Sequence, residues 1–393
     1  MIEGRAATKT DGARFQALDG WRGICALLVV GFHAPVGGIA ENSGVIRNAF
    51  LFVDFFFVLS GFVITHAFFE KLKAERAFGR FFLLRLFRVY PLHLFMLALY
   101  VAVECAMLAV KGPGEAFQGG TSIAGLIANL AMVHSLGVLD TLTWNYPSWS
   151  ISAELVAYGL FGLAVVTVPR LIVPLCALAI VIGLPVIALV NGNMDASSNL
   201  GWLRCVAGFS LGVILRRAIW REEAGETARR HVISWSLAEA AAVLLLIVFV
   251  DQIGSTTLSV LAPLVFAFAL YVFSHEGGVL SRGLKLRPIA FLGAVSYSIY
   301  MTHAFVIDRA INATSVLGRL TGWAVFSQAS DGRRLIGVTG WQGDIALVMI
   351  VAATLVVSAL TWRWVEQPGM ALGRRLVSRR KPAAKDDGAK AAA

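Results

Sequence analysis

The chain has 393 residues, of which 58% are hydrophobic and only 15% are charged. Soluble domains carry about 25% charged residues, so this composition excludes an ordinary soluble fold. The net charge of +10 comes from basic residues clustered between apolar runs, which is the pattern of cytoplasmic loops rather than of a nucleic-acid-binding surface.

Apolar runs long enough to cross a bilayer recur along the chain. A helical span needs about 20 apolar residues. Candidate runs lie at 21–38, 49–69, 90–110, 150–168, 171–190, 200–219, 233–251, 257–274, 289–308 and 344–364. A weaker run at 121–139 is broken by Asn129, His134 and Gly137. The expected fold is therefore an all-α polytopic transmembrane bundle of about ten spans, with one re-entrant or interfacial segment.

The basic loops predict the orientation of these spans. The segments rich in lysine and arginine are 70–88, 216–231, 280–287 and the tail after Glu366. The segments with one lysine or arginine in total are 111–120, 191–199 and 251–256. Basic loops stay in the cytoplasm, so ten crossings would leave both termini there. An eleventh crossing at 121–139 would place later arginine clusters outside, so this segment is expected not to cross.

The expected organisation is a cytoplasmic segment 1–17, a membrane domain 18–370 and a basic cytoplasmic tail 371–393. Non-helical backbone at membrane depth is tolerated where it lines a cavity, so 121–150 is expected to line an outward cavity. The outer segment 309–343 is long for a loop. It is expected to be either a lid that faces substrate or a floppy connector.

Arg22 and His33 lie eleven residues apart in the first apolar run. Eleven helical steps return to within about 20° of the same face and rise about 16 Å. An arginine at the membrane boundary would then lie beneath an imidazole well inside the span. Ionisable groups at such depth usually serve function, and the alternative is a satisfied polar pair between packed helices.

Two carboxylates fall at a depth similar to that of His33. Asp54 lies near the outer start of the second span, and Glu154 near that of the span beginning at 150. A buried carboxylate without a partner is costly, so the three side chains are expected to converge. A histidine oriented by Asp54 or Glu154 is a competent general base. The alternative is a structural bond between helices.

A short basic and aromatic run, 81–90, precedes Pro91 on the cytoplasmic side. Arg85 and Arg88 are three residues apart and share one helix face. Paired guanidiniums suit the bidentate binding of phosphate. The alternative is an interfacial helix whose arginines extend to lipid phosphates.

Other motif-like signals are discounted. The pattern Gly208-Phe209-Ser210-Leu211-Gly212 resembles a hydrolase nucleophile turn, but such a turn needs a strand–turn–helix context. Here the small residues are expected to pack helices closely. The histidines show no metal-ligand spacing, and the four cysteines lie in apolar runs as core residues. No metal site is expected.

Six motifs, in order along the chain, together resemble the membrane-bound acyltransferase-3 family, which includes O-acetyltransferases that modify bacterial surface polysaccharides. They are Leu18-Asp19-Gly20-Trp21-Arg22-Gly23 through His33, Asp54 through Gly61, Arg85-x-x-Arg88-x-x-Pro91, Trp149-Ser150-x-x-x-Glu154, Ser296-Tyr297-Ser298-Ile299-Tyr300-Met301-Thr302-His303, and Trp364-Val365-Glu366-Gln367-Pro368. The resemblance covers roughly residues 15–370.

The resemblance implies that acyl-CoA, by default acetyl-CoA, is offered from the cytoplasm. Arg85 and Arg88 would hold its phosphates, and Arg22 would either guide the donor toward His33 or stabilise charge on the donor. His33 would be essential, with Glu154 or Asp54 as its partner.

The same resemblance implies that Tyr300 and His303 line the donor path. Ser150 belongs to the motif that carries Trp149, whose indole is expected either to stack on a sugar or to anchor the chain in the membrane interface.

The implied acceptor is a hydroxyl of a cell-surface polysaccharide or glycolipid at the bacterial inner membrane. The acyl group would move directly, with His33 as general base, or through an acyl-histidine. Two alternatives remain: a multispan transporter, against which the chain shows no internal repeat, and an acyltransferase acting on a small molecule or lipid. Membrane lipids are expected partners and nucleic acids are not.

Overall fold

The computed structural model describes residues 15–112, 114–221 and 231–379. Most of the predicted cytoplasmic segment 1–17, the end of the predicted tail 371–393 and positions 222–230 of the basic loop lie outside the described residues.

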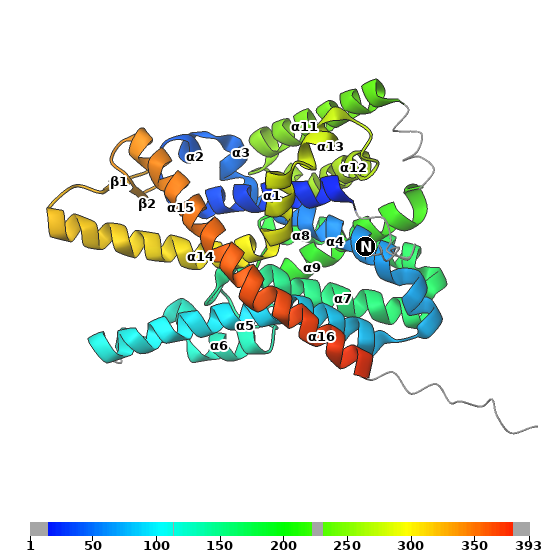
Figure 1. Cartoon of the computed structure of the whole chain (residues 1–393), viewed down its shortest axis with the longest axis horizontal. Helices are drawn as coiled ribbons and strands as arrows, with labels where there is room; N and C mark the ends of the chain where they lie inside the picture. Colours follow the sequence, from blue (N-terminus) through cyan, green and yellow to red (C-terminus); the bar gives the residue numbers. More distant parts are fainter. Residues whose placement is uncertain (1–14, 113, 222–230, 380–393) are drawn as a thin grey trace, which may run out of the picture.

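The described chain is almost entirely helical and forms one bundle (Figure 1), which confirms the expected all-α fold. Its long helices are α1 (Gln16–His33), α4 (Phe52–Glu75), α5 (Phe78–Lys111), α7 (Trp149–Thr167), α8 (Ile172–Asn191), α9 (Gly201–Ile214), α11 (Val232–Ile253), α12 (Ala262–Ser274), α14 (Arg287–Thr321), α15 (Gly340–Thr361) and α16 (Gln367–Arg379). Among the described residues, eight helical stretches are long and apolar enough to span a membrane.

The short elements are α2 (Ile39–Asn42), α3 (Gly44–Arg47), α6 (Ile123–Leu130), α13 (Val279–Leu284), strands β1 (Phe326–Gln328) and β2 (Arg334–Ile336), the 3₁₀ turns Ala49–Leu51, Gly119–Thr121, Tyr146–Ser148, Pro169–Leu171 and Thr257–Leu261, and the π-helical turns Leu215–Ile219 and Trp362–Glu366. The π turn at Trp362–Glu366 joins α15 to α16 in one continuous rod.

Helices α1 and α9 were expected as spans but fall outside the eight. Polar residues, including Asp19 and Arg22, lower the apolar character of α1, and α9 has only 14 residues. Both pack tightly inside the bundle. Gly23 of α1 lies against Gly293 of α14, where an added Cβ would come 2.7 Å from the Gly293 nitrogen.

Glycine also brings α4 and α9 together. A Cβ at Gly61 would overlap the Phe209 carbonyl, and a Cβ at Gly212 would overlap the Val58 carbonyl. The glycines around Ser210 therefore serve helix packing, as expected, and the segment is helical rather than a strand–turn–helix.

The segment 121–139 does not cross as a helix. Helix α6 has eight residues and spans about 12 Å, against a bilayer core of about 30 Å. Tyr90 and His93 of α5 hold its end, through the Leu130 carbonyl at 2.7 Å and the Asn129 carbonyl at 3.0 Å. Of 121–150, Ser150 lines the cavity described below, which also holds Arg22 and Arg85. That cavity is not the outward one expected for this segment, and the outward cavity stays a prediction.

The expectation of a long loop at 309–343 was wrong. Helix α14 continues to Thr321 and ends at Gly322, whose φ of 72° is left-handed. Strands β1 and β2 then form an antiparallel hairpin. The Ile336 amide donates to the Pro35 carbonyl at 2.7 Å, so the hairpin is anchored two residues beyond His33.

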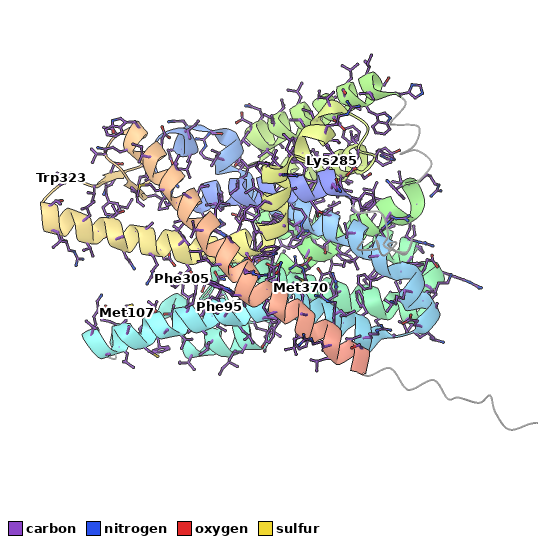
Figure 2. The ribbon with its side chains drawn as sticks, in the orientation of Figure 1. Phe95, Met107, Lys285, Phe305, Trp323 and Met370 are labelled. Atoms are coloured by element: carbon purple, nitrogen blue, oxygen red, sulfur yellow. The ribbon has the colours of Figure 1, made fainter. Side chains whose placement is uncertain are left out.

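The two described chain ends, at the start of α1 and the end of α16, lie toward the same end of the bundle in Figure 1. Figure 2 places Met107 of α5 and Trp323, just after α14, at the opposite end. Two chain ends at the same end of the bundle are consistent with an even number of crossings.

Candidate functional site

Helices α1, α4, α5, α7 and α14 enclose a cavity of about 710 Å³. This volume is within the range of about 300–1,000 Å³ that is typical of small-molecule and cofactor sites. Of the predicted site residues, those that line the cavity are Arg22, Arg85, Arg88, Ser150, Glu154 and Tyr300. The α4 wall is largely apolar and includes Val53, Phe56, Phe57, Leu59, Val63 and Ile64.

Arg85 faces the cavity from α5 with an unsatisfied donor. Its Nε is buried and has no hydrogen-bond partner among the described residues. Its guanidinium lies 4.8 Å from the centre of the Phe68 ring. A buried donor without a partner is costly, so this guanidinium is suited to an anionic ligand.

Arg22 enters the same cavity from the first turns of α1. Its Nη1 lies 3.6 Å from Asp19 Oδ1 on the same helix, a distance beyond that of a good hydrogen bond. Arg22 and Arg85 thus supply two guanidiniums to one cavity.

Arg88 is already neutralised by the protein. It forms an ion pair with Glu366, which lies at the end of the π turn that joins α15 to α16. Glu366 also accepts from Ser298 Oγ at 2.7 Å. The two neighbouring arginines therefore differ: both reach the cavity, but Arg88 connects α5 to the π turn and, through Glu366, to Ser298 of α14.

The two predicted carboxylate partners of His33 lie in other contacts. Asp54 accepts from Arg204 Nε at 3.0 Å and Nη2 at 2.7 Å, and both side chains are almost fully buried. Glu154 accepts from Ser60 Oγ at 2.6 Å, and Ser60 Oγ also lies 3.0 Å from the Tyr158 hydroxyl. The expected His33–Asp54 pair is thus corrected to an Asp54–Arg204 ion pair.

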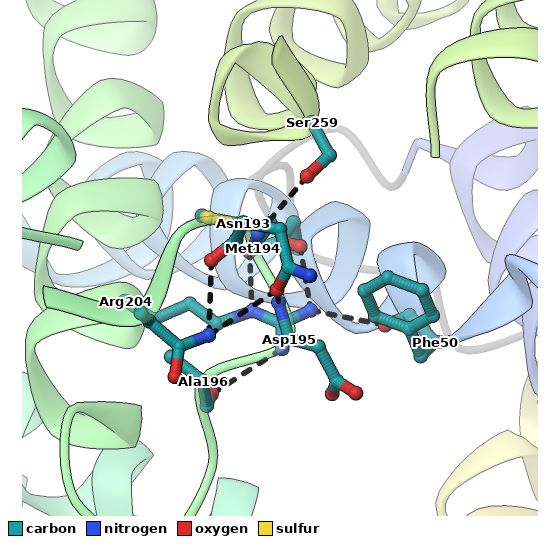
Figure 3. A network of polar contacts seen from close by, with 9 residues as sticks. Phe50, Asn193, Met194, Asp195, Ala196, Arg204 and Ser259 are labelled. Atoms are coloured by element: carbon teal, nitrogen blue, oxygen red, sulfur yellow. Dashed lines mark hydrogen bonds and ion pairs between the residues drawn. The ribbon is translucent and has the colours of Figure 1, made fainter. Parts of the chain in front are cut away.

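Arg204 organises the network shown in Figure 3. It also donates to the carbonyls of Phe50, at 3.0 Å, and Ala196, at 3.3 Å, and so ties α9 to the start of α4 and to the turn before α9. The sequence interpretation missed this residue. The signal was present, because Arg204 lies deep inside the apolar run 200–219, far from the arginines at its end, and an arginine at such depth requires a buried acidic partner.

Trp149 packs beside the Arg204 network. Its side chain is 7% exposed and packs against Gly201 and the Arg204 guanidinium, 5.5 Å from the ring centre. The expectation that this indole stacks on a sugar or anchors the membrane interface is therefore corrected, because a buried ring has no free face for either role.

His33 is paired with another histidine. His33 Nδ1 lies 3.1 Å from His303 Nε2 and 3.0 Å from the Val29 carbonyl. The Tyr146 ring is 5.0 Å from the His33 ring, centre to centre. His33 is partly exposed and His303 is fully buried.

Tyr300 joins this pair to the cavity. It lines the cavity, its hydroxyl accepts from Ser150 Oγ at 2.9 Å, and its ring centre is 5.8 Å from that of His303. The order of contact is therefore cavity, Tyr300, His303 and His33. No group of three or more potential ligands that could hold a metal ion occurs within the described ranges.

Comparisons of the sequence with known proteins cover most of the chain. The sequence model of the family described as an acyltransferase domain matches residues 15–363. The chain is 27% identical over 356 residues to "Acyltransferase MdmB" of Streptomyces mycarofaciens, with 84% of this chain and 82% of that protein covered. It is 34% identical over 159 residues to "Protein 2 in picA locus" of Rhizobium radiobacter, with 38% of this chain and 81% of that protein covered. No solved structure matches the chain.

Proposed function

Because the chain belongs to the acyltransferase family whose domain it matches over most of its length, we propose that it moves an acyl group, by default acetyl, from acyl-CoA to an acceptor hydroxyl. One observation carries this proposal. A single cavity is lined both by arginine guanidiniums and by Tyr300, and Tyr300 contacts the His303–His33 pair. Family membership favours this reaction over transport.

The donor is bound through its phosphates. Arg85 and Arg22 supply the charge-assisted hydrogen bonds, because their guanidiniums are less satisfied than that of Arg88. The apolar wall of α4 fits the pantetheine arm. The thioester then lies toward Ser150 and Tyr300, which are the cavity-lining residues nearest to the histidine pair.

The chemical step uses His33. The imidazole removes the proton from the acceptor hydroxyl, the oxygen attacks the thioester carbonyl carbon, and the carbon–sulfur bond breaks. The coenzyme A thiolate then takes the proton. A covalent acyl-histidine is the second route, and trapping labelled acyl-enzyme without acceptor distinguishes the two.

The acceptor approaches His33 from the end of the bundle that carries the hairpin. That end is the predicted outer face, so the acceptor is a hydroxyl of a surface polysaccharide or glycolipid at the bacterial inner membrane. Both termini are then cytoplasmic. A small-molecule or lipid acceptor is the alternative.

Acetyl-CoA binding to the detergent-purified protein tests the donor site. Arg85→Gln is expected to weaken binding about 10- to 100-fold, because it removes one charge-assisted hydrogen bond that contributes about 1.5–3 kcal/mol. Arg282→Gln, at an exposed position of α13, is the matched control and should bind as the parent does. Equal affinity in all three proteins, or no binding in any, would refute the donor assignment.

A further inference from the structure

We infer that His303 is a positioning residue that fixes the tautomer of His33 and leaves His33 Nε2 as the reacting nitrogen. The inference rests on the proposed function, and it identifies the orienting partner that the sequence assigned to a carboxylate.

Two backbone carbonyls determine where the protons lie. His33 Nδ1 is 3.0 Å from the Val29 oxygen, and His303 Nδ1 is 3.3 Å from the Ile299 oxygen. A carbonyl oxygen only accepts hydrogen bonds, whereas a neutral imidazole carries its one proton on either nitrogen. Each Nδ1 therefore carries the proton, because the opposite tautomer would place a lone pair against a carbonyl oxygen.

The contact between the rings follows from this assignment. His303 Nε2 is then an acceptor, and it faces the protonated His33 Nδ1 at 3.1 Å. The His33 N–H is shared between the Val29 oxygen and His303. The lone pair of His33 remains on Nε2, which is the only ring nitrogen of His33 left to act as a base.

This arrangement supports the charge that develops during transfer. When His33 Nε2 takes the acceptor proton, the ring becomes an imidazolium, and its Nδ1–H donates to neutral His303. When the carbon–sulfur bond breaks, Nε2 returns the proton to the thiolate. The carboxylates are bonded elsewhere, Asp54 to Arg204 and Glu154 to Ser60. His303 therefore takes the role of the third group that orients a catalytic base, a role often held by an acidic residue.

Two variants of His303 test the inference. In His303→Gln, the side-chain oxygen falls near the position of Nε2 and still accepts from His33. In His303→Asn, the amide falls near Nδ1 and leaves His33 Nδ1 without that acceptor. We expect His303→Gln to keep kcat within about 10-fold of the parent, and His303→Asn to lose about 100-fold or more. KM for acetyl-CoA should be unchanged in both, since neither removes an arginine.

Equal kcat in the two variants, or a loss confined to KM, would overturn the positioning role.

A second measurement needs no variant. Phe32-His33 is the only Phe-His pair in the chain, so pairwise isotope labelling of phenylalanine and histidine selects the His33 signals in the full-length protein. Nitrogen-15 spectra should show Nδ1 protonated and Nε2 unprotonated.

A protonated Nε2 in resting His33 would refute the inference while leaving acyl transfer intact. Absence of acyl transfer with the predicted tautomer present would instead refute the proposed function. The two failures are therefore distinguishable.

Discussion

Arg85 and Arg88 lie one helical turn apart, but their surroundings assign them different tasks. Arg85 presents a buried Nε that has no partner in the described part of the chain, whereas Arg88 pairs with Glu366. Substitution at the first position should therefore affect ligand binding, and substitution at the second should affect folding.

Arg88→Gln is expected to lower the free energy of unfolding by about 2–3 kcal/mol. It leaves Glu366 buried without its cation, and the cost is below the 3–5 kcal/mol of a fully buried pair because the Arg88 side chain is 23% exposed. Thermal unfolding in detergent measures the loss. The Arg88→Gln, Glu366→Gln double variant should recover part of it, and a double variant less stable than the single one would contradict the pairing.

Arg204→Met should destabilise the protein by about 3–5 kcal/mol, because Asp54 would remain buried and unpaired. Adding Asp54→Asn should restore much of the stability, since the uncompensated charge is then removed. If the two substitutions were simply additive in unfolding experiments, the two residues would not be coupled and the Asp54–Arg204 ion pair would be contradicted.

At the scale of elements, close contact between α4 and α9 holds one wall of the cavity in place. Gly61→Ala would press a methyl group against the Phe209 carbonyl and should cost about 1–3 kcal/mol. Gly79→Ala on α5 is the matched control, because no described atom lies within 4 Å of its added Cβ. It should be neutral or stabilise by up to about 1 kcal/mol. Melting temperatures that fall equally in both variants would argue against the tight α4–α9 contact.

Long apolar helices were predictable from the sequence, whereas contacts between helices were not. Hydropathy located the spans and loop charge excluded a crossing at 121–139. The length of α14 was missed because 309–321 is polar on one side, a pattern that was interpreted as a loop. This segment contains no proline, and it continues the helix. The hairpin that follows depends on its contact with Pro35, which local sequence does not reveal.

For the candidate site, six of the predicted residues line the cavity, whereas the pairings of the predicted residues could not be predicted. Intramembrane charge identified Arg22, His33, Asp54 and Glu154, since such groups are costly without a function or a partner. Which groups pair depends on how helices far apart in sequence approach one another. Arg204 lies 150 residues from Asp54, and His303 lies 270 residues from His33.

At the scale of the whole molecule, the hairpin and the end of α16 are expected on opposite sides of the membrane. Asp331→Cys and Arg375→Cys, both at exposed positions, would be labelled separately in a background without the native cysteines. A membrane-impermeant maleimide should label position 331 from outside and position 375 only from the cytoplasm. Labelling of both positions from one side would contradict the predicted topology.

The most direct test of the central claim is a structure of the full-length protein with a non-hydrolysable acetyl-CoA analogue. The account predicts phosphate density at Arg22 and Arg85, and the acyl group beside Ser150 and Tyr300, directed toward His33. Density for the analogue outside this cavity, or an acyl group directed away from the histidine pair, would contradict it.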